Sequence, residues 1–420
     1  MNREEERKKP KAVIFTLGCK VNEVESASLA EGLALRGYEV SVALGYADLY
    51  ILNTCAVTAE AEKKSRQLIA RARKYNPAAA VVVCGCAAQK DPQAFASREG
   101  VLVVTGAQAK SRLFDLLDKK GVFLEEDGKK FDELPFPAAV KTRNFVKIQD
   151  GCNRFCSYCV IPYLRGRSRS RPMESVVEEV RSSRAEETVI TGVDISSYDD
   201  NGRKLPELLL ALKDIPTRLR LGSLEPRAVS EDLLSAAKKV HDFAPHFHLS
   251  LQSGSDRILS KMNRRYTREE YLAKCRLIYA AFPLAAITTD IIVGFPEEDE
   301  ADFEDTLSIC DEAGFAQIHP FVFSPREGTP AAKREQLPFA VKEERKKRMI
   351  AKAEEVEEKY VVKCLYKTFS FLPETQEGGR TWGYTENYIR VCVEGEVKSK
   401  VPVRLIKREK NICIGEITDE

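Results

Sequence analysis

The amino-terminal part of the chain alternates short apolar runs with amphipathic stretches. The apolar runs predict β-strands over Lys11–Leu17, Asp48–Asn53, Ala79–Val83 and Val101–Thr105. The stretches between them predict helices, and strands that alternate with helices indicate a doubly wound parallel sheet. Asn22 is expected to cap the helix after the first strand, with Glu25 three residues further on.

A charged and then proline-containing stretch at residues 121–140 is expected to be a linker. Beyond it, apolar runs return at the spacing of βα units. They predict six more strands, over Phe145–Ile148, Thr188–Thr191, Arg218–Gly222, Phe247–Leu251, Ala286–Val293 and Gln317–Phe323. Six strands that alternate with helices predict an open or partial (β/α) barrel.

The pattern changes near the carboxyl end. Residues 337–360 form a highly charged helical stretch that is expected to be solvated on most of its surface. Beyond Tyr360, apolar and polar residues alternate with period two, around a glycine-rich turn, which predicts a small antiparallel β barrel of the OB type. The chain is therefore expected to be an α/β protein with domains at residues 11–125, 138–358 and 360–420.

The amino-acid composition excludes several classes of protein function. Of the 420 residues, 43% are hydrophobic and 31% charged, and the net charge is +2, so nucleic-acid binding would depend on local basic patches. The charged amino terminus does not resemble a signal peptide and no apolar stretch could span a membrane, so a soluble, cytoplasmic protein is expected. Twelve cysteines in a reducing compartment indicate metal or redox chemistry, whereas only four histidines argue against a histidine-based metal site.

The strongest motif is the closely spaced trio Cys152, Cys156 and Cys159, just after the first strand of the expected barrel. Three thiolates on one loop can converge on one metal centre. A four-iron cluster normally takes four thiolates, so three leave one iron open to chelate a substrate. The alternative is a structural zinc site without a nearby fourth ligand, but barrel folds keep their active sites at this end of the strands.

A second trio, Cys19, Cys55 and Cys86, follows predicted strands of the amino-terminal sheet. Because the carboxyl ends of parallel strands share one edge, these thiols can meet there and hold a second cluster with an open iron. The alternative is three buried cysteines that behave as small apolar side chains. Cys84 competes with Cys86 as a ligand. The cysteines without metal-like spacing are expected to pack in cores, and they are Cys275, Cys310, Cys364, Cys392 and Cys413.

The loop from Cys152 to Cys159 resembles the cluster loop of radical S-adenosylmethionine (SAM) enzymes. In that superfamily the open iron binds the amino and carboxylate groups of SAM, and one electron cleaves the sulfonium to give a 5′-deoxyadenosyl radical. Later motifs resemble the SAM-binding strand ends of the superfamily, although each glycine among them also fits a simple tight turn. The resemblance assigns to SAM the residues Tyr158, Thr191, Gly192, Ser223, Glu225, Gln252, Ile292 and Gly294.

The whole chain from about residue 11 resembles the methylthiotransferase family, which combines both cysteine trios with a small β domain. In that family a glycine precedes the third amino-terminal ligand and a glutamine follows it, which favours Cys86, between Gly85 and Gln89, over Cys84. The carboxyl-terminal domain resembles a TRAM domain, an RNA-contacting barrel, with a typical strand start at Gly383–Ile389. The resemblance implies two [4Fe–4S] clusters on the two trios and SAM as cofactor.

The resemblance also implies the reaction, in which sulfur and a methyl group enter an unactivated C–H bond. SAM would supply both the radical and the methyl group, and no side chain is assigned as acid or base. Family members modify tRNA adenosines or a ribosomal-protein aspartate. Lys20 and Thr58 resemble the subgroup that modifies C2 of N6-threonylcarbamoyladenosine at tRNA position 37. The isopentenyl-adenosine subgroup usually differs at both positions, and the protein-modifying subgroup usually has proline in place of Lys20.

The partners implied by the resemblance are the tRNA anticodon loop, SAM and an electron donor such as flavodoxin or ferredoxin, with no membrane. The four arginines of Arg165–Arg171 favour contacts to RNA phosphates or the SAM carboxylate over simple solvation. The basic run between Lys63 and Lys74 is expected to be a solvated helix face that could still lie near RNA. A non-enzymatic alternative is an iron–sulfur RNA-binding sensor, but a sensor has no use for the SAM motifs.

Overall fold

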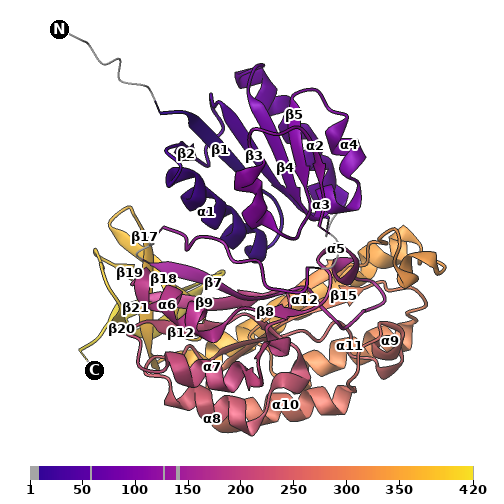
Figure 1. Cartoon of the computed structure of the whole chain (residues 1–420). Coiled ribbons are helices and arrows are strands. Elements are labelled where there is room, and N and C mark those ends of the chain that lie inside the picture. Colours follow the sequence, from indigo (N-terminus) through magenta and orange to yellow (C-terminus); the bar gives the residue numbers. More distant parts are fainter. Residues whose placement is uncertain (1–8, 57–58, 126–127, 139–141, 420) are drawn as a thin grey trace. The chain divides into compact units, whose positions relative to one another are not determined.

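The computed structural model describes residues 9–56, 59–125, 128–138 and 142–419 (Figure 1). The chain forms two compact units. The first comprises residues 1–138, 149–153 and 160–171, and the second comprises residues 139–148, 154–159 and 172–420. No helix among the described residues is long and apolar enough to cross a membrane.

The first unit is built on a six-stranded parallel sheet of order β2-β1-β3-β4-β5-β6. Its strands are β1 (Lys11–Thr16), β2 (Glu39–Ser41), β3 (Leu49–Thr54), β4 (Ala80–Gly85), β5 (Val101–Thr105) and β6 (Gly121–Phe123). The helices are α1 (Lys20–Ala34), α2 (Ala59–Tyr75), α3 (Cys86–Lys90), α4 (Pro92–Ala96) and α5 (Ile161–Leu164). Apolar residues of α1 pack on one face of the sheet, and those of α2 and α4 pack on the other. The predicted doubly wound sheet is therefore confirmed.

Two predictions for this unit are wrong. The expected linker at residues 121–140 contributes a strand, because Gly121–Phe123 pairs with β5 and extends the sheet by one strand. Asn22 does not cap α1. The helix starts at Lys20 with Cys19 at the cap position, and the Asn22 side chain is used elsewhere. Glu25 is likewise not part of a capping box, since it forms buried ion pairs.

The second unit contains the six central strands predicted from the sequence, with one of them broken. They are β7 (Arg143–Asp150), β9 (Glu187–Gly192), β12 (Arg218–Leu221) with β13 (Ser223–Leu224), β14 (His246–Leu249), β15 (Ala286–Val293) and β16 (Gln317–Val322). The last two residues of β7 belong to the first unit, where they pair with β8 (Arg169–Ser170). The break falls at Gly222, where an added Cβ would lie 2.9 Å from the Ile190 carbonyl oxygen.

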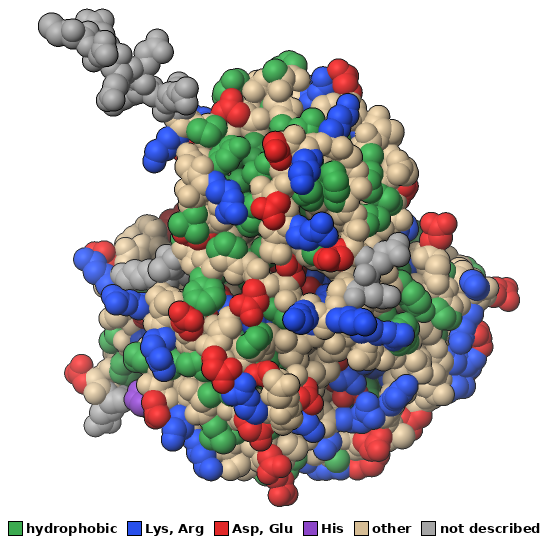
Figure 2. Space-filling view, viewed as in Figure 1, with side chains coloured by type: hydrophobic (Ala, Val, Ile, Leu, Met, Phe, Trp, Pro, Cys, Tyr) green, Lys and Arg blue, Asp and Glu red, His purple; other side chains and the backbone are tan. Residues whose placement is uncertain are grey.

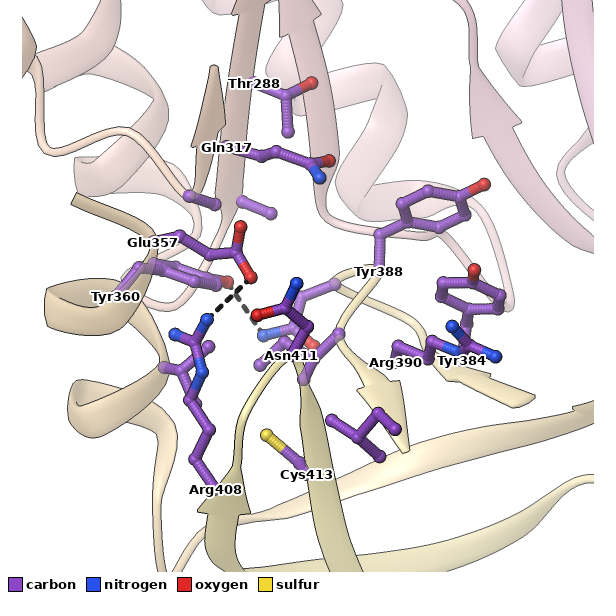
Figure 3. Close-up of a pocket in the computed structure, with 16 residues that line it drawn as sticks. Thr288, Gln317, Glu357, Tyr360, Tyr384, Tyr388, Arg390, Arg408, Asn411 and Cys413 are labelled. Carbon is purple, nitrogen blue, oxygen red and sulfur yellow. Dashed lines mark hydrogen bonds and ion pairs between the residues drawn. The ribbon is translucent and has the colours of Figure 1, made fainter. Parts of the chain in front are cut away.

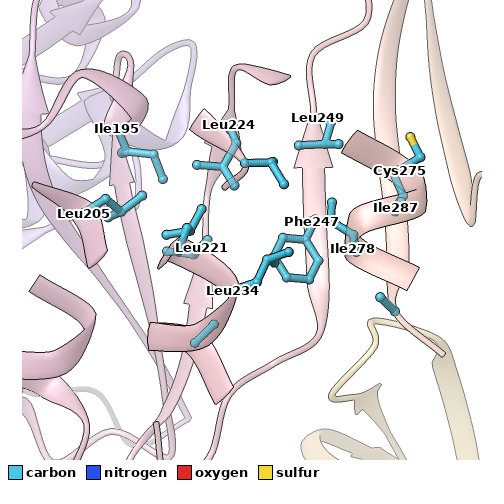
Figure 4. Close-up of a cluster of buried hydrophobic side chains, with 14 of the residues drawn as sticks. Ile195, Leu205, Leu221, Leu224, Leu234, Phe247, Leu249, Cys275, Ile278 and Ile287 are labelled. Atoms are coloured by element: carbon cyan, nitrogen blue, oxygen red, sulfur yellow. The ribbon is translucent and has the colours of Figure 1, made fainter. Parts of the chain in front are cut away.

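Helices cover the outer face of these strands and bury a large apolar core (Figure 4). They are α6 (Met173–Ser183), α7 (Leu205–Leu212), α8 (Glu231–Lys239), α9 (Asp256–Lys261), α10 (Arg268–Ala281) and α11 (Glu300–Ala313). Capping boxes start α10 at Thr267 and α11 at Asp299, which fixes where each helix begins. This arrangement confirms the partial (β/α) barrel.

A 26-residue helix, α12 (Phe339–Cys364), leads to the carboxyl-terminal barrel. It is less solvated than expected, because Met349, Val356 and Tyr360 are buried. The closed barrel has the order β17-β18-β19-β21-β20. Its strands are β17 (Thr368–Glu377), β18 (Arg380–Thr385), β19 (Arg390–Glu394), β20 (Val401–Glu409) and β21 (Ile412–Ile417). The predicted small barrel is confirmed, with the difference that β19 and β21 pair in parallel.

Candidate functional site

Three cysteine-bearing segments meet at the carboxyl edge of the first unit's sheet. Cys55 directly follows β3 and Cys86 directly follows β4, and the last residues of these strands, Thr54 and Gly85, are register partners. Cys19 lies three residues beyond β1, the other neighbour of β3. An added Cβ on the preceding residue, Gly18, would lie 2.6 Å from the Cys55 sulfur. Cys55 and Cys86 are buried and Cys19 is exposed.

Polar side chains next to the cysteines hold these segments together. The Asn22 amide donates to the carbonyl oxygens of Leu17 (2.7 Å) and Thr54 (3.0 Å). The Thr54 hydroxyl donates to the Cys84 carbonyl oxygen at 2.6 Å. Gly85 has φ +97°, and an added Cβ would lie 2.4 Å from the Thr54 carbonyl oxygen. Glycine before Cys86 is therefore required by both the backbone conformation and the close approach of β3.

A buried ionic cluster lies behind the cysteines. Lys110 contacts Glu25 and donates to Asn53 Oδ1 (2.8 Å), and Arg165 donates to Glu25 Oε1 (2.9 Å) and Asp150 Oδ1 (3.0 Å). All four charged side chains are at least 97% buried. Sequence reasoning missed this cluster, because its members come from four separate segments.

The two candidate cysteines, Cys84 within β4 and Cys86 at the start of α3, differ in environment. Burial raises the pKa of the Cys84 thiol to about 11, and its side chain packs in the apolar core beneath α1. Burial also raises the pKa of the Cys86 thiol, and the charges of Lys110 and Arg165 oppose the shift at both cysteines. Cys86 lies just beyond the end of β4, at the edge that also carries Cys55, whereas Cys84 lies inside the strand, so position favours Cys86 as the ligand.

The donor set at this edge fits an iron–sulfur cluster. Among the described residues, no three Cys, His, Asp or Glu side chains are gathered as ligands of a single ion. A four-iron cluster places its thiolate ligands on different irons, so it needs ligands spread along an edge. Two buried cations close to Cys86 suit an anionic thiolate-bound group.

The backbone around the radical SAM cysteines is held by hydrogen bonds within each unit. Cys152 belongs to the first unit, where its backbone N–H donates to the Gly166 carbonyl oxygen at 3.1 Å. Cys156 and Cys159 belong to the second unit and are joined by a hydrogen bond from Cys159 N to Cys156 O at 3.0 Å. All three cysteines are partly exposed.

The loop around Cys156 is anchored by the segment after α9. Ser157 N donates to the Met262 carbonyl oxygen at 3.0 Å, and the Asn263 amide donates to the carbonyl oxygen of Phe155 at 2.8 Å. The Arg264 guanidinium lies 3.6 Å from the Cys156 sulfur. Sequence reasoning missed Arg264, because it lies in a short connection without periodicity.

The residues assigned to SAM lie at the carboxyl ends of the central strands. Thr191 and Gly192 end β9, Ser223 starts the short β13, and Gly294 directly follows β15. Gln252 lies beyond β14 and is tied to β15, since its N–H donates to Asp290 O and its carbonyl oxygen accepts from Ile292 N, each at 2.9 Å.

Tyr158 and Ile292 pack against the same small apolar cluster, whose members are Ile258, Met262, Phe295, Phe323 and Ala331. Glu225 lies 3.4 Å from the Arg154 guanidinium, which also pairs with Asp194 at 2.7 Å. Arg154 and Asp194 were not assigned from the sequence. The structure thus brings Tyr158 and Ile292 together and ties Glu225 to the loop that carries Cys156.

The arginine-rich segment after the cluster loop differs from expectation. Arg165, Arg169 and Arg171 are buried, and only Arg167 is exposed. Arg165 is held by carboxylates of the first unit, so the predicted contact to RNA phosphate or SAM is wrong for this residue. Basic side chains on the face shown in Figure 2 are interspersed with acidic ones, in keeping with the small net charge.

The predicted basic helix face lies on α2. Lys64, Arg71 and Lys74 are exposed, and Arg73 pairs with Glu99 at 2.6 Å. The side chain of Lys63 and the whole of Thr58 lie outside the described residues. The described part of this face is therefore solvated, as expected.

A cavity of about 290 Å³ lies between α12, the carboxyl-terminal barrel and the amino-terminal ends of β15 and β16 (Figure 3). Its wall includes the stacked rings of Tyr384 and Tyr388, 4.6 Å apart, and the Glu357–Arg408 ion pair at 2.9 Å. The SAM motifs lie at the opposite ends of these strands, so the cavity is separate from them.

Comparison with known proteins assigns the family. A model of the radical SAM superfamily matches residues 146–310, and a model described as the uncharacterized protein family UPF0004 matches residues 11–106. The chain is 40% identical over 415 residues to the threonylcarbamoyladenosine tRNA methylthiotransferase MtaB of Chlamydia pneumoniae, which covers 96% of this chain and 97% of that protein. This chain belongs to the radical SAM methylthiotransferase family.

Relatives within the methylthiotransferase family are named for more than one tRNA substrate. The tRNA-2-methylthio-N(6)-dimethylallyladenosine synthase of Oceanobacillus iheyensis is 34% identical over 429 residues, covering 96% of this chain and 78% of that protein. Among solved structures, the radical SAM methyltransferase TsrM from Kitasatospora setae has a TM-score of 0.54 at 15% identity, over 77% of this chain and 76% of that chain. This likeness shows the fold alone.

Proposed function

We propose that this methylthiotransferase adds a methylthio group to C2 of N6-threonylcarbamoyladenosine at tRNA position 37. The observation that carries the proposal is the 40% identity to the Chlamydia pneumoniae protein of that name, which extends over nearly the full length of both chains. Lys20 and Thr58 support the same subgroup. A cytoplasmic location follows from a tRNA substrate, and flavodoxin or ferredoxin is the proposed class of electron donor.

The proposed ligands of the radical-generating cluster are Cys152, Cys156 and Cys159, and those of the second cluster are Cys19, Cys55 and Cys86. When bound, the two [4Fe–4S] clusters and SAM supply the radical, the sulfur and the methyl group. The proposed SAM contacts are Tyr158, Thr191, Gly192, Ser223, Glu225, Gln252, Ile292 and Gly294.

In this proposal, the residues of the chain bind the cofactors and hold the cysteine segments in place. Ser157 and Asn263 fix the backbone around Cys156, and Arg264 places a cation beside its sulfur. In the first unit, Asn22 fixes the segment of Cys19 against that of Cys55, and Arg165 and Lys110 offset negative charge near Cys86. Positioning of this kind suits a reaction whose chemistry resides in cofactors.

A second candidate substrate is isopentenyl (dimethylallyl) adenosine, because a relative of that name is 34% identical over 96% of this chain. A ribosomal-protein aspartate is disfavoured by Lys20, where that subgroup usually has proline. Nucleoside mass spectrometry of tRNA from a strain that lacks the gene tests the choice. The expected result is loss of 2-methylthio-N6-threonylcarbamoyladenosine, with accumulation of its unthiolated precursor. Loss of the isopentenyl product instead would overturn the proposal.

A further inference from the structure

The inner face of the central strands carries polar residues that the proposed function leaves unassigned. Side chains along a strand point alternately to its two faces. The outer face of β14 and β15 is apolar, and Figure 4 shows Phe247 and Ile287 in the core formed with the helices. The inner face carries three of the chain's four histidines, His246, His248 and His319.

His248, on β14, lies at the centre of this polar row. Its Nδ1 lies 3.0 Å from the Thr288 hydroxyl, and its Nε2 lies 3.3 Å from Asp290 Oδ2. Asp290 is the register partner of His319 on β16, and the rings of His248 and His319 stack with centroids 6.0 Å apart. The side chain of Asp290 is 31% exposed and that of His248 is 14% exposed, so the inner face is accessible.

An exposed aromatic ring follows these groups along β16, toward the carboxyl ends of the strands. Phe321 follows His319 by two residues on the same face of β16, and its side chain is 53% exposed. Its register partner on β15 is Ile292, one of the proposed SAM contacts. Two residues along a strand span roughly 6.6 Å. Phe321 and His319 are therefore neighbours on this face, next to the residues proposed to bind SAM.

The carboxyl-terminal barrel closes the inner face at the amino-terminal ends of β14 and β15. The Tyr388 ring packs against His246 in a tilted arrangement, with centroids 5.0 Å apart, and the Arg220 guanidinium lies 4.7 Å from the centre of the Tyr388 ring. His246 Nε2 also contacts the Thr288 hydroxyl at 3.2 Å. A ligand would therefore reach His248, Asp290 and His319 from the end of the strands that carries the SAM motifs.

We propose that Phe321 stacks on the target adenine and that Asp290, His248 and His319 bind the polar substituent on its N6 atom. The inference rests on the proposed function and names the residues that select the substrate. Exposed aromatic rings bind unpaired bases by stacking. A threonylcarbamoyl group has N–H and O–H donors for the Asp290 carboxylate, and its carbonyl oxygen and its own ionised carboxylate can accept from an imidazole N–H on the side away from Asp290.

The protonation state of His319 leaves it able both to donate and to accept a hydrogen bond. Burial lowers the pKa of His319, although Asp290 opposes this shift, so at neutral pH the imidazole has one N–H donor and one acceptor nitrogen. An isopentenyl group has no polar atom, so its binding would leave these groups unpaired at a cost in affinity.

The experiment measures the binding of two anticodon stem-loop RNAs to the reconstituted full-length protein with SAM. One RNA carries N6-threonylcarbamoyladenosine at position 37, and the other carries unmodified adenosine. Asp290→Asn and His319→Gln are expected to weaken binding of the modified RNA about 10- to 100-fold and to leave the unmodified RNA unchanged. Phe321→Ala is expected to weaken both RNAs about 5- to 150-fold.

Two variants serve as controls. His241→Gln changes the one histidine outside the inner face, and Leu210→Ala trims an exposed apolar side chain on α7, so neither should alter either affinity. If Asp290→Asn and His319→Gln keep the preference of the unchanged protein for the modified RNA, or weaken both RNAs equally, the inference is overturned and the proposed function stands. If the unchanged protein shows no preference and forms no methylthio product, the proposed function fails first.

Discussion

The Arg165 guanidinium lies 2.9 Å from Glu25 Oε1, and both side chains are at least 98% buried. Glu25 belongs to the helix that starts just after Cys19, and Arg165 to the segment that follows the radical SAM cysteine loop. Asp150, the second carboxylate bound by Arg165, lies two residues before Cys152. Within the first unit, one buried arginine therefore links the chain around Cys152 to the helix next to Cys19.

Replacing Arg165 should destabilise the first unit strongly. Arg165→Met leaves two buried carboxylates with one fewer cation, a change that costs about 3–5 kcal/mol for buried pairs. Hydrogen exchange of the α1 amides measures the loss. Arg167→Met is the matched control, because it changes an exposed arginine of the same segment. Equal protection of α1 in the two variants would contradict the role given to Arg165.

Gly85→Ala tests the close approach of β3 and β4 before Cys86. The variant carries the cost of a backbone conformation that essentially only glycine adopts (φ +97°, ψ −170°), about 1–3 kcal/mol, together with a clash with the Thr54 carbonyl oxygen. Gly37→Ala is the control, because Gly37 also has a positive φ (+87°) but an added Cβ would meet nothing within 4 Å. Chemical denaturation should show a clearly larger loss for Gly85→Ala. A similar loss in both variants would show that the clash is relieved.

The central barrel should lose stability in acid through Glu187. Burial raises the pKa of this carboxyl, but Arg220 (2.7 Å) and Arg143 (2.6 Å) outweigh burial and hold it at about 2. A depressed pKa gives stability that is present above the unfolded value near 4.3 and lost as the pH falls toward 2. The contribution is at most about 3 kcal/mol.

Glu187→Gln should therefore be less stable than the unchanged protein at pH 7, and the difference should shrink between pH 4 and pH 2. Thermal unfolding across this range measures it. Glu174→Gln is the control, since the pKa of Glu174 is also about 2 but its pair with Arg203 is solvent-exposed and screened. A constant difference between Glu187→Gln and the unchanged protein over this pH range would contradict the prediction.

Iron content tests the second cysteine trio. The anaerobically reconstituted chain should hold about eight irons, and the triple variant Cys19→Ala, Cys55→Ala, Cys86→Ala about four. Cys84→Ala is the control, because Cys84 is packed in the apolar core beneath α1 and should leave the count near eight. A drop to four in Cys84→Ala, with Cys86→Ala unchanged, would reverse the choice between the two cysteines.

Local patterns predicted most of the fold. Strands of the first unit such as Leu49–Thr54 contain apolar runs, and the bounds of the four predicted strands lie within two residues of prediction. The strand at Gly121–Phe123 was missed, because three residues in a charged stretch carry too little pattern and the strand depends on its partner β5. Asn22 carries a capping signature but bonds across the sheet edge, a choice that only the tertiary structure determines.

The sequence predicted those parts of the candidate site whose residues lie close together along the chain. The spacing of Cys152, Cys156 and Cys159 is visible directly. By contrast, the partners of Arg165 lie up to 143 residues away, so a basic segment that suggested RNA contacts proved largely buried. The inner-face site escaped sequence analysis for the same reason, since Asp290 and His319 become neighbours only through strand register.

The most direct test of the central claim is mass spectrometry of nucleosides after reaction of the reconstituted protein with SAM that carries a trideuterated methyl group. The substrate is tRNA with N6-threonylcarbamoyladenosine at position 37. The expected product is this nucleoside with one added sulfur and one trideuterated methyl group at C2. The triple variant of Cys19, Cys55 and Cys86 should still form 5′-deoxyadenosine but no labelled nucleoside. A labelled product from the triple variant, or none from the unchanged protein while it cleaves SAM, would contradict the claim.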